Sequence, residues 1–361
     1  MSAYNYINNP HYRIFLFPLA LFYWGVMFWR NVFYNIGIFV SHNLPCKVIS
    51  IGNITAGGTG KTPAVIYLAK LLIKHGQRVA VLSRGYGRST KGTFVVSLGD
   101  NNWQMVGDEP ALLAEKLPDV PLVLDENRYR GGMHIIRHFN PDVIILDDGF
   151  QHRRLNRDLD ITLLNSNQTG FAYKLLPYGL LREPWHHLKR ADITILTKTN
   201  LNRPSHFIYN KLKSLKIVSY NSKVVPSESL IGTNGKMVPI NTMQNERVVA
   251  VSGIGDPIGF ELLLKELHLN IVDHISFDDH HQYSKPDLNI IKKIMGEKEG
   301  RFILTTEKDM IKLRTIKHKI CKKIYALPIR FLLSKKGQQE ILNKLGFKSV
   351  LHPKQTSYQQ K

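Results

Sequence analysis

The sequence predicts an α/β protein made of two parallel-sheet domains in series, and three observations support this. Between residues 47 and 220, short apolar runs alternate with stretches of helical periodicity, as in a parallel sheet covered by helices. Asn234-Gly235 then lies between two short apolar runs and predicts a β-hairpin. Beyond the hairpin, the same alternation resumes at Arg247. The 361 residues leave room for two cores of ordinary size.

In order along the chain, apolar runs predict strands at residues 47–52, 78–83, 121–124, 142–147, 160–164, 192–197 and 216–220, and then at 247–252, 271–277, 301–305 and 323–327. Helical patterns predict helices between them at 62–75, 109–117, 127–139, 205–215 and 258–267. We therefore divide the chain into an N-terminal segment (1–44), a first α/β domain (45–228), a β-hairpin linker (229–244), a smaller second α/β domain (245–350) and a flexible tail (351–361).

The connection between the first strand and the first helix is a glycine-rich, phosphate-binding sequence. It reads Ile51-Gly-Asn-Ile-Thr-Ala-Gly-Gly-Thr-Gly-Lys-Thr-Pro63. Backbone N–H groups of such a loop, and the positive end of the following helix, bind phosphate oxygens. The pattern predicts a P-loop NTPase-type domain in which a nucleoside triphosphate is bound by Thr55, Ala56, Gly57, Gly58, Thr59, Gly60, Lys61 and Thr62. We expect Lys61 to contact the β- and γ-phosphates and Thr62 to bind Mg²⁺.

The loop departs from the common P-loop pattern at one position, because Thr55 stands where that pattern has glycine. We expect Gly52, Gly57 and Gly58 to supply the backbone positions with positive φ instead.

A second part of a nucleotide site follows the strand expected at 142–147. This continuous apolar run ends in Asp147 and Asp148, as a buried parallel strand does. A carboxylate at the carboxyl end of such a strand can hold the Mg²⁺ of a nucleotide, directly or through water. We therefore expect Thr62, Asp147 and Asp148 to form a metal site.

Composition favours acidic partners and a reducing compartment. The net charge is +21, and the first 99 residues hold ten Lys and Arg but no Asp or Glu. Nucleic acid, anionic lipid or a phosphorylated substrate would be attracted to such a chain. The two cysteines, Cys46 and Cys321, are far apart and form neither a disulfide framework nor a metal-binding spacing.

The N-terminal segment is apolar and aromatic. Residues 14–29 carry no charge, and twelve of the 35 aromatic residues lie between Tyr4 and Tyr34. A helix of this length covers only about 24 Å, short of a hydrocarbon core of about 30 Å, and Pro18 would disturb it. We interpret the segment as a helix in the membrane interface, with a buried core helix and a full membrane span as alternatives.

At this point the residues carry a family resemblance. The loop with its unusual Thr55 resembles the phosphate loop of the lipid A 4′-kinases (tetraacyldisaccharide 4′-kinases). Further matches follow in the family's order, namely Ser83-Arg-Gly-Tyr-Gly87, Gly107-Asp-Glu-Pro110, Asp147-Asp-Gly-Phe-Gln-His152, Leu176-Pro-Tyr-Gly-Leu-Leu-Arg-Glu-Pro184, Gly253-Ile-Gly-Asp-Pro257, Asp279-His-His281 and Thr306-Glu-Lys-Asp309. Each motif alone is weak, but together they cover nearly the whole chain.

The resemblance implies a kinase that uses ATP and Mg²⁺. It would transfer the γ-phosphoryl group to the 4′-hydroxyl of a tetraacyl glucosamine disaccharide 1-phosphate in lipid A biosynthesis. The reaction would take place at the cytoplasmic face of the bacterial inner membrane. The expected partners are therefore this lipid A disaccharide precursor and an anionic membrane surface, and no nucleic acid is expected.

The resemblance also implies catalytic roles for Lys61, Asp108 and His280. Asp108 matches the family's catalytic aspartate and would accept the hydroxyl proton, although its position also fits a helix N-cap. Its partner would come from the Asp279-His280-His281 cluster, where His280 is preferred over His281. Because these histidines lie in the second domain, catalysis would need the two domains to close on each other.

Arginine suits phosphate binding, so the resemblance makes Arg84, His152 and Arg182 candidates for the substrate or the transferred phosphoryl group, with Arg88 as a further one. Lys308 matches a family motif without a defined role. At Asp256 the family commonly has a different residue.

Other classes of protein fit less well. A GTPase would need [NT]-K-x-D, but Leu196-Thr-Lys-Thr-Asn200 lacks the aspartate. A nucleic-acid-stimulated ATPase fits the charge but not the aromatic N-terminal segment, and a membrane adaptor would not need the nucleotide motifs. Another membrane-associated P-loop ATPase, or a nucleic-acid-stimulated ATPase, stays open as the alternative.

Overall fold

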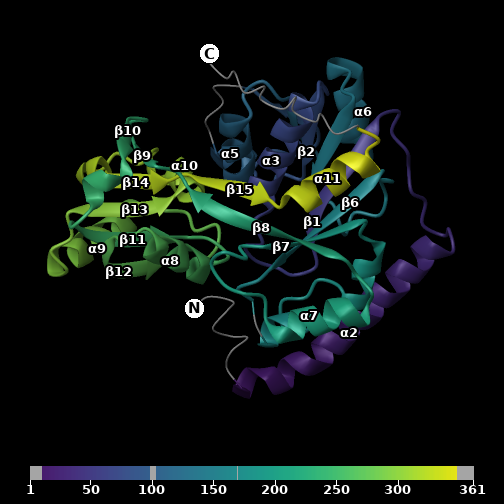
Figure 1. Cartoon of the computed structure of the whole chain (residues 1–361), viewed down its shortest axis with the longest axis horizontal. Helices are drawn as coiled ribbons and strands as arrows, with labels where there is room; N and C mark the ends of the chain where they lie inside the picture. Colours follow the sequence, from purple (N-terminus) through teal and green to yellow (C-terminus); the bar gives the residue numbers. More distant parts are fainter. Residues whose placement is uncertain (1–9, 98–102, 169, 348–361) are drawn as a thin grey trace, which may run out of the picture.

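The computed structural model describes residues 10–97, 103–168 and 170–347. They form two α/β domains side by side, each built on its own sheet (Figure 1). The larger sheet has nine strands and the smaller one has six. The expected tail at 351–361 lies outside the described residues.

The helices are α2 (Pro10–Asn35), α3 (Lys61–Lys74), α4 (Trp103–Val106), α5 (Asp108–Lys116), α6 (Arg128–Phe139), α7 (His206–Ser214), α8 (Pro257–Glu266), α9 (Lys285–Glu297), α10 (Glu307–Leu313) and α11 (Lys335–Lys344). The 3-10 turns are η1 (Gly170–Tyr173), η2 (Trp185–Arg190), η3 (Ile240–Met243) and η4 (Lys319–Lys323). The strands are β1 (Lys47–Asn53), β2 (Val79–Ser83), β3 (Phe94–Val96), β4 (Leu122–Leu124), β5 (Val143–Asp147), β6 (Leu159–Asn165), β7 (Ile193–Thr197), β8 (Ser219–Pro226), β9 (Ser229–Gly232), β10 (Met237–Pro239), β11 (Arg247–Ser252), β12 (Asn270–Ser276), β13 (Phe302–Thr306), β14 (Ile324–Leu327) and β15 (Ile329–Leu333).

The larger sheet confirms the predicted parallel architecture. Its order is β15-β8-β7-β6-β1-β5-β2-β4-β3, and only the two edge strands, β3 and β15, run antiparallel to their neighbours. β1 pairs with β5 so that Ile51 lies opposite Asp147. The loop after β1 and the carboxylates after β5 therefore emerge side by side at the same edge of the sheet.

Both faces of this sheet are covered, which explains its continuous apolar strands. Successive side chains of β5 alternate between the faces. Val143 and Ile145 pack under α3, α5 and α11, whereas Ile144 and Leu146 pack on the face that carries α6. A further cluster, around Phe150, holds η1, η2 and α7 against the sheet.

The smaller sheet has the order β10-β9-β14-β13-β11-β12, with four parallel strands and the β9–β10 hairpin at one edge. Val249 and Val251 pack against α9 and α10, and Val248 and Ala250 pack against α8. The predicted hairpin is therefore present, but it is not a linker. β9 pairs with β14, because the short apolar run of β9 is buried only when it joins a sheet.

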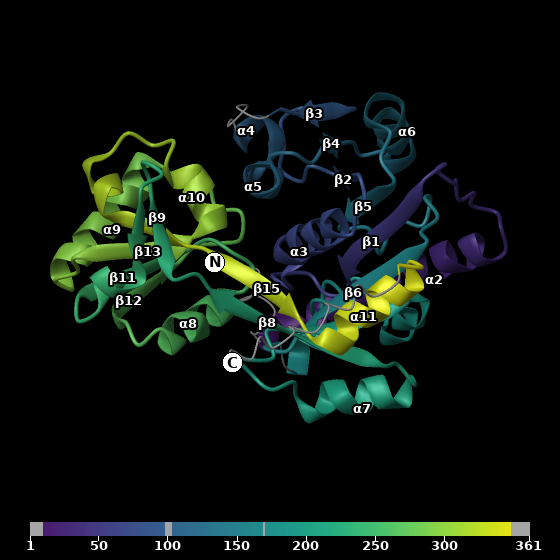
Figure 2. The same ribbon diagram turned by 45° about the horizontal axis from the view of Figure 1, so that its top comes forward.

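The chain crosses between the two sheets twice, from the larger sheet to the smaller one along β8 and back along β15 (Figure 2). They pair antiparallel from Pro226–Ile329 to Ser222–Leu333. The second domain was predicted to continue to residue 350, so this boundary was wrong. Residues 329–347 return to the larger sheet, where α11 packs in its core. Likewise, the strand expected at 216–220 begins at Ser219 and extends to Pro226, because it is half of this connection.

The N-terminal helix is longer than predicted. α2 is continuous through Pro18 over 26 residues, or about 39 Å at about 1.5 Å per residue. Pro18 removes one backbone hydrogen bond, which the many remaining bonds of so long a helix tolerate. α2 lies along the outside of the first domain (Figure 1).

Candidate active site

A cavity of about 1480 Å³ lies between the two domains. It is lined from three sides, and its chemistry-bearing residues are Thr59, Gly60, Lys61, Thr62, Arg84, Glu109, Arg128, Asp147, Asp148, His152 and Arg182 of the first domain, Asp256, Asp279, His280 and Lys308 of the second, and Tyr23, Met27 and Arg30 of α2. Residues far apart in the sequence thus meet in one space.

The P-loop occupies residues 54–60, between the end of β1 and the first turn of α3. Gly57 and Gly60 have positive φ, at 99° and 86°, so Gly57 was predicted correctly but Gly52 and Gly58 were not. Gly52 is needed for space instead, because a Cβ there would lie 2.6 Å from the Cβ of Phe150. The position of Thr55 does not require a glycine, because Thr55 has no positive φ and pairs with Leu181 in an isolated β-bridge.

A loop of the second domain rests directly on the P-loop. A Cβ on Gly255 would lie 2.7 Å from the backbone N of Gly58. Asp256 makes an ion pair with Lys198, and its carboxylate also accepts a hydrogen bond from Asn165 at 2.8 Å. Lys198 in turn donates to the carbonyl of Gly58 at 2.9 Å. We call Asp256, Lys198 and Asn165 the P-loop latch. Asp256, the departure from the family pattern, is one of its members.

The carboxylates after β5 have different surroundings. Asp147 is buried and accepts a hydrogen bond from the Ser83 hydroxyl at 2.9 Å. Burial, together with Glu109 and Asp148, raises the pKa of Asp147 to about 6. Burial also opposes ionisation of Asp148, but Lys61 and Arg182 outweigh it and lower its pKa.

These charges form a chain along the cavity wall. Lys61 Nζ lies 3.6 Å from Asp148, and Arg182 Nη1 donates to both oxygens of that carboxylate at 2.9 and 2.8 Å. Arg128, almost fully buried, donates to the carbonyl of Asp147 at 3.2 Å. Burial lowers the pKa of Arg128 to about 10. Sequence reasoning missed Arg128 because an arginine inside a helix pattern carries no local signal.

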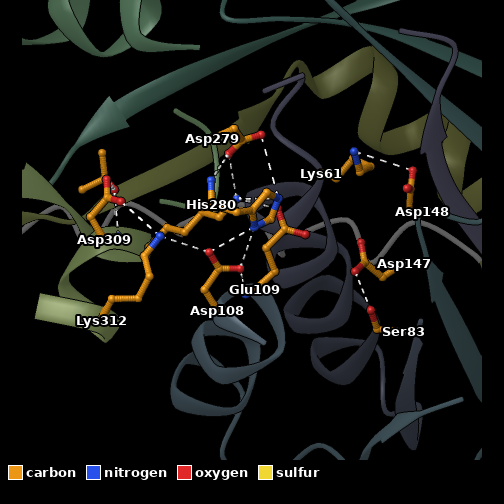
Figure 3. A network of polar contacts seen from close by, with 12 residues as sticks. Lys61, Ser83, Asp108, Glu109, Asp147, Asp148, Asp279, His280, Asp309 and Lys312 are labelled. Atoms are coloured by element: carbon orange, nitrogen blue, oxygen red, sulfur yellow. Dashed lines mark hydrogen bonds and ion pairs between the residues drawn. The ribbon is translucent and has the colours of Figure 1, made fainter. Parts of the chain in front are cut away.

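The predicted pair of Asp108 and His280 is assembled across the two domains (Figure 3). His280 Nδ1 lies 3.0 and 3.1 Å from the two oxygens of Asp108. His281 instead stacks on Phe277 and pairs with Asp287 at 3.3 Å, so the choice of His280 is the one that the geometry supports. The helix-cap alternative for Asp108 is wrong, because Gly107 is the N-cap of α5 and Asp108 is its first residue.

His280 stands between Asp108 and the cavity. Asp108 is 5% exposed, whereas His280 lines the cavity. Burial opposes ionisation of Asp108, but the hydrogen bond from His280 and the charges of Lys308 and Lys312 outweigh it and lower its pKa below the usual range. Burial would lower the pKa of His280, but the hydrogen bond to Asp108 prevails and raises it. In this arrangement His280 is the member of the pair that lines the cavity, and Asp108 lies behind it.

Two lysines of α10 flank this pair. Lys308 Nζ lies 3.1 Å from Glu109, 3.2 Å from Asp279 and 3.3 Å from His280 Nε2. Burial would lower the pKa of Lys308, but these carboxylates raise it. Lys312 is 1% exposed and donates to Asp108 Oδ2 at 3.2 Å. Sequence reasoning did not single out Lys312, because lysine is normally a surface residue.

Three of the four candidates for substrate contacts lie at the cavity. Arg84 is exposed at its wall, and Arg182 forms the ion pair with Asp148. His152 also lines the cavity, and burial together with nearby arginines, first Arg128, lowers its pKa to about 4. Arg88 is used structurally instead, because it pairs with Glu126 at 2.5 Å and donates to two backbone carbonyls.

The helix α2 reaches the same cavity. The hydroxyl of Tyr23 donates to the carbonyl of Arg182 at 2.8 Å, and Arg30 lies 3.9 Å from Glu183. Among the described residues, α2 is the one helix long and apolar enough to cross a membrane, and only 17% of its apolar window is buried.

Comparisons with known proteins agree with this geometry. Residues 12–346 match the family model of the tetraacyldisaccharide-1-P 4′-kinases. A tetraacyldisaccharide 4′-kinase of Aquifex aeolicus is 37% identical over 93% of this chain and 98% of its own length. One of Syntrophus aciditrophicus is 39% identical over 90% and 89%.

A solved structure supports the fold as well. A crystal structure of LpxK from Aquifex aeolicus in complex with ATP matches with a TM-score of 0.72 and 36% sequence identity. The match covers 92% of this chain and 99% of that one. The family model, the relatives and the solved structure agree, and this chain belongs to the tetraacyldisaccharide-1-P 4′-kinases.

Proposed function

We propose that this chain transfers the γ-phosphoryl group of ATP to the 4′-hydroxyl of a tetraacyl glucosamine disaccharide 1-phosphate, the lipid A precursor. The observation that carries this proposal is the single cavity between the domains. It brings together a P-loop, two strand-end carboxylates and an aspartate–histidine pair, and it opens against the aromatic helix α2. A nucleotide, a hydroxyl acceptor and a lipid surface are the three things that a lipid kinase must bind.

The triphosphate of ATP would be bound by residues 55–62. Gly57 and Gly60 give the loop its positive φ angles, and α3 begins at Lys61 with its N–H groups directed to the loop. Lys61, 13% exposed, is the cation placed for the β- and γ-phosphates. The negative charge of the triphosphate would replace the present partner of Lys61, the carboxylate of Asp148.

The residues at the end of β5 fit a Mg²⁺ ion. Asp147 Oδ1 is buried without a hydrogen-bond partner in the described structure, and a cation at this place would satisfy it. Thr62, in the first turn of α3, and Asp148 supply the other oxygens. When bound, Mg²⁺ neutralises charge on the phosphoryl oxygens.

The proton of the 4′-hydroxyl would be accepted by His280. Its Nδ1 is held by Asp108, which fixes the tautomer and leaves Nε2 as the accepting atom on the cavity side. Asp108 thus orients the imidazole and stabilises its charged form. This assignment exchanges the two roles expected from the sequence, and it follows from the burial of Asp108.

Arg84, His152 and Arg182 would contact the lipid's phosphates and sugar, and α2 would rest in the membrane surface. The outer face of α2 carries Phe15 at 77% exposure, Phe22 at 74% and Trp29 at 57%, spaced seven positions apart. Such a stripe buries apolar side chains in the headgroup boundary. The enzyme would therefore work on the cytoplasmic face of the bacterial inner membrane, where the basic first 99 residues favour anionic lipids.

A direct assay tests this proposal. The purified full-length protein is incubated in detergent with Mg²⁺, radiolabelled ATP and tetraacyl disaccharide 1-phosphate, and the lipids are separated by thin-layer chromatography. The expected result is a labelled bis-phosphorylated lipid. A disaccharide that lacks its 4′-hydroxyl is the control and should stay unlabelled. ATP hydrolysis without any labelled lipid would count against the kinase and for another membrane-associated ATPase.

A further inference from the structure

The buried lysine Lys312 lies behind the Asp108–His280 pair, on the side away from the cavity. It is 1% exposed, among the largest fully buried side chains of the described residues. Its Nζ contacts two carboxylates that come from different domains, Asp108 Oδ2 at 3.2 Å and Asp309 Oδ1 at 3.4 Å. A buried ammonium group is unfavourable unless it is paired, and here it is paired twice.

Lys312 is also linked to the backbone that carries His280. Asp309 is fully buried, and its second oxygen accepts hydrogen bonds from the backbone N–H of Gly253 at 3.0 Å and the Thr306 hydroxyl at 2.7 Å. The carbonyl of Gly253 accepts in turn from the N–H of His280 at 3.2 Å. One side of Lys312 therefore contacts Asp108 directly, and the other leads through Asp309 and Gly253 to His280.

A buried ion pair is weak evidence for a stabilising role, because apolar side chains of the same volume often stabilise a core equally well. A cation at this place does have an electrostatic consequence. It keeps Asp108 ionised, and the ionised carboxylate is the stronger acceptor for the Nδ1–H of His280. It also lies close enough to oppose protonation of the imidazole.

We propose that Lys312 is a positioning residue that fixes Asp108 as a carboxylate and sets the pH at which His280 can accept a proton. This inference rests on the proposed role of the Asp108–His280 pair. Lys312 acts through the two carboxylates that it contacts, which are Asp108 and, by way of Gly253 and the backbone of His280, Asp309. Lys308, one turn earlier on α10, faces the cavity and is a different kind of residue.

The charged groups that face His280 come from three elements. α5 contributes Asp108 and Glu109, α10 contributes Lys308 and Lys312, and Asp279 precedes His280 in its own loop. The ring of Tyr86 also packs on the imidazole. Without the positive charge of Lys312, three carboxylates would face a single lysine around the ring instead of two. His280 would therefore hold its proton more tightly, which means that its pKa would rise.

The test compares Lys312→Met with Asp309→Asn in pH profiles of kcat/KM for the lipid. Loss of the cation in Lys312→Met should move the acidic limb to higher pH by about one pH unit and lower kcat by about 10²-fold, the scale of a displaced catalytic group. Its KM for ATP should stay within about twofold, because Lys312 lies outside the cavity. Loss of an anion in Asp309→Asn should move the acidic limb the opposite way, to lower pH. Lys312→Arg keeps the positive charge and should therefore retain part of the kcat that Lys312→Met loses.

Arg314→Gln is the matched control. Arg314 is the C-cap residue of α10 and, like Lys312, pairs with a carboxylate of the other domain, in its case Glu115 at 2.9 Å. It touches neither Asp108 nor His280. It should leave the limb in place. If Lys312→Met does not fold, the direction in which the acidic limb moves in Asp309→Asn tests the inference by itself. A limb that stays fixed in the folded variants while only the melting temperature falls would overturn the inference. A wild-type profile without any acidic limb would instead contradict the proposed base, and so the two failures are distinguishable.

Discussion

Asp108 and His280 are separated by 172 positions in the sequence, yet their side chains lie 3.0 Å apart. Their residue types could be recognised in advance because an aspartate and a histidine are common partners in proton transfer. Their roles could not, because the role depends on which side chain faces the cavity. Burial of Asp108 is the observation on which the proposed roles depend, and Lys308 and Lys312 complete a set of charges that motifs alone do not reveal.

At the residue scale, Lys61→Ala should lower kcat by at least about 10²-fold, since the developing phosphoryl charge loses its fixed cation. The fold should survive, because Lys61 pairs only with the partly exposed Asp148 at 3.6 Å. Single-turnover kinetics and a thermal melt measure the two effects. Lys213→Ala, on the exposed side of α7, is the control and should keep full activity. Normal turnover in Lys61→Ala would remove the P-loop assignment.

Asp108→Asn should lower kcat by about 10²-fold or more, because the imidazole loses the carboxylate that orients it. The hydrogen bond to Asp108 raises the pKa of His280, so the acidic limb of the kcat/KM profile should move to lower pH in this variant. A profile measured from pH 5 to 9 gives both quantities. An unchanged limb would show that Asp108 does not set the protonation of His280.

The ionised carboxylate of Asp108 should also contribute to the stability of the fold. The folded pKa of Asp108 lies below its unfolded value, so the ionised group stabilises the fold at pH values above the usual carboxyl range. This contribution is lost as the pH falls below that range. Wild type should therefore melt above Asp108→Asn at pH 7, and the difference should shrink below about pH 4. A difference that persists in acid would point to packing rather than charge.

At the scale of elements, the loop between β11 and α8 rests on the P-loop, and the P-loop latch joins the two. Asp256→Asn should keep the N-cap hydrogen bond that Gly259 donates at 2.9 Å but weaken the pair with Lys198. The loss of one charged hydrogen bond, about 1.5 to 3 kcal/mol, predicts a KM for ATP higher by about tenfold or more. The KM for lipid should change less.

Asp273→Asn is the matched control for the latch, because this carboxylate lies on β12 and pairs with Lys298 at 3.8 Å, away from the P-loop. Initial rates over a range of ATP concentrations give the comparison. Equal ATP dependence in Asp256→Asn and wild type would mean that the latch does not hold the P-loop for nucleotide.

α2 is the second element with a prediction of its own. Its inner face is held to the body, since Ala20, Met27 and Asn31 are buried and Arg153 donates to Asn31. Its outer face is free for lipid. Phe22→Ser combined with Trp29→Ser should therefore reduce binding to vesicles and raise the KM for lipid, with little change in the KM for ATP.

Sedimentation with vesicles of rising anionic lipid content measures this binding, which should also weaken with salt. Ile290→Ser, which changes a half-exposed apolar residue on α9, is the control and should bind as wild type does. If the double variant sediments like wild type and its lipid kinetics are normal, α2 does not anchor the protein by its outer face.

At the scale of the whole molecule, the site is divided between two sheets that the chain joins twice. The P-loop, Asp147 and Asp148 belong to the domain of the larger sheet, and His280, Lys308 and Lys312 belong to the domain of the smaller one. The paired strands β8 and β15 connect the sheets as a two-stranded ribbon. The closure of the two domains that the sequence led us to expect stays a prediction, and it would be a movement about this ribbon.

The sequence by itself determined the elements and the chemistry. Apolar runs and helical periods are local, so strands such as β1 and β5 and helices such as α3 could be predicted within a few residues. The glycine-rich loop, the two aspartates after β5 and the motifs shared with the family are equally local.

The tertiary structure alone decided how these parts are combined. It placed the hairpin in the second sheet, returned residues 329–347 to the first, and put Asp108 behind His280 with Lys312 beneath it. Each of these depends on pairing between segments more than about ninety residues apart, and such pairing leaves no periodicity in the sequence. Whether a charged side chain faces water, a substrate or a buried partner is likewise a property of the folded chain, because burial is decided by neighbours that the local sequence does not contain.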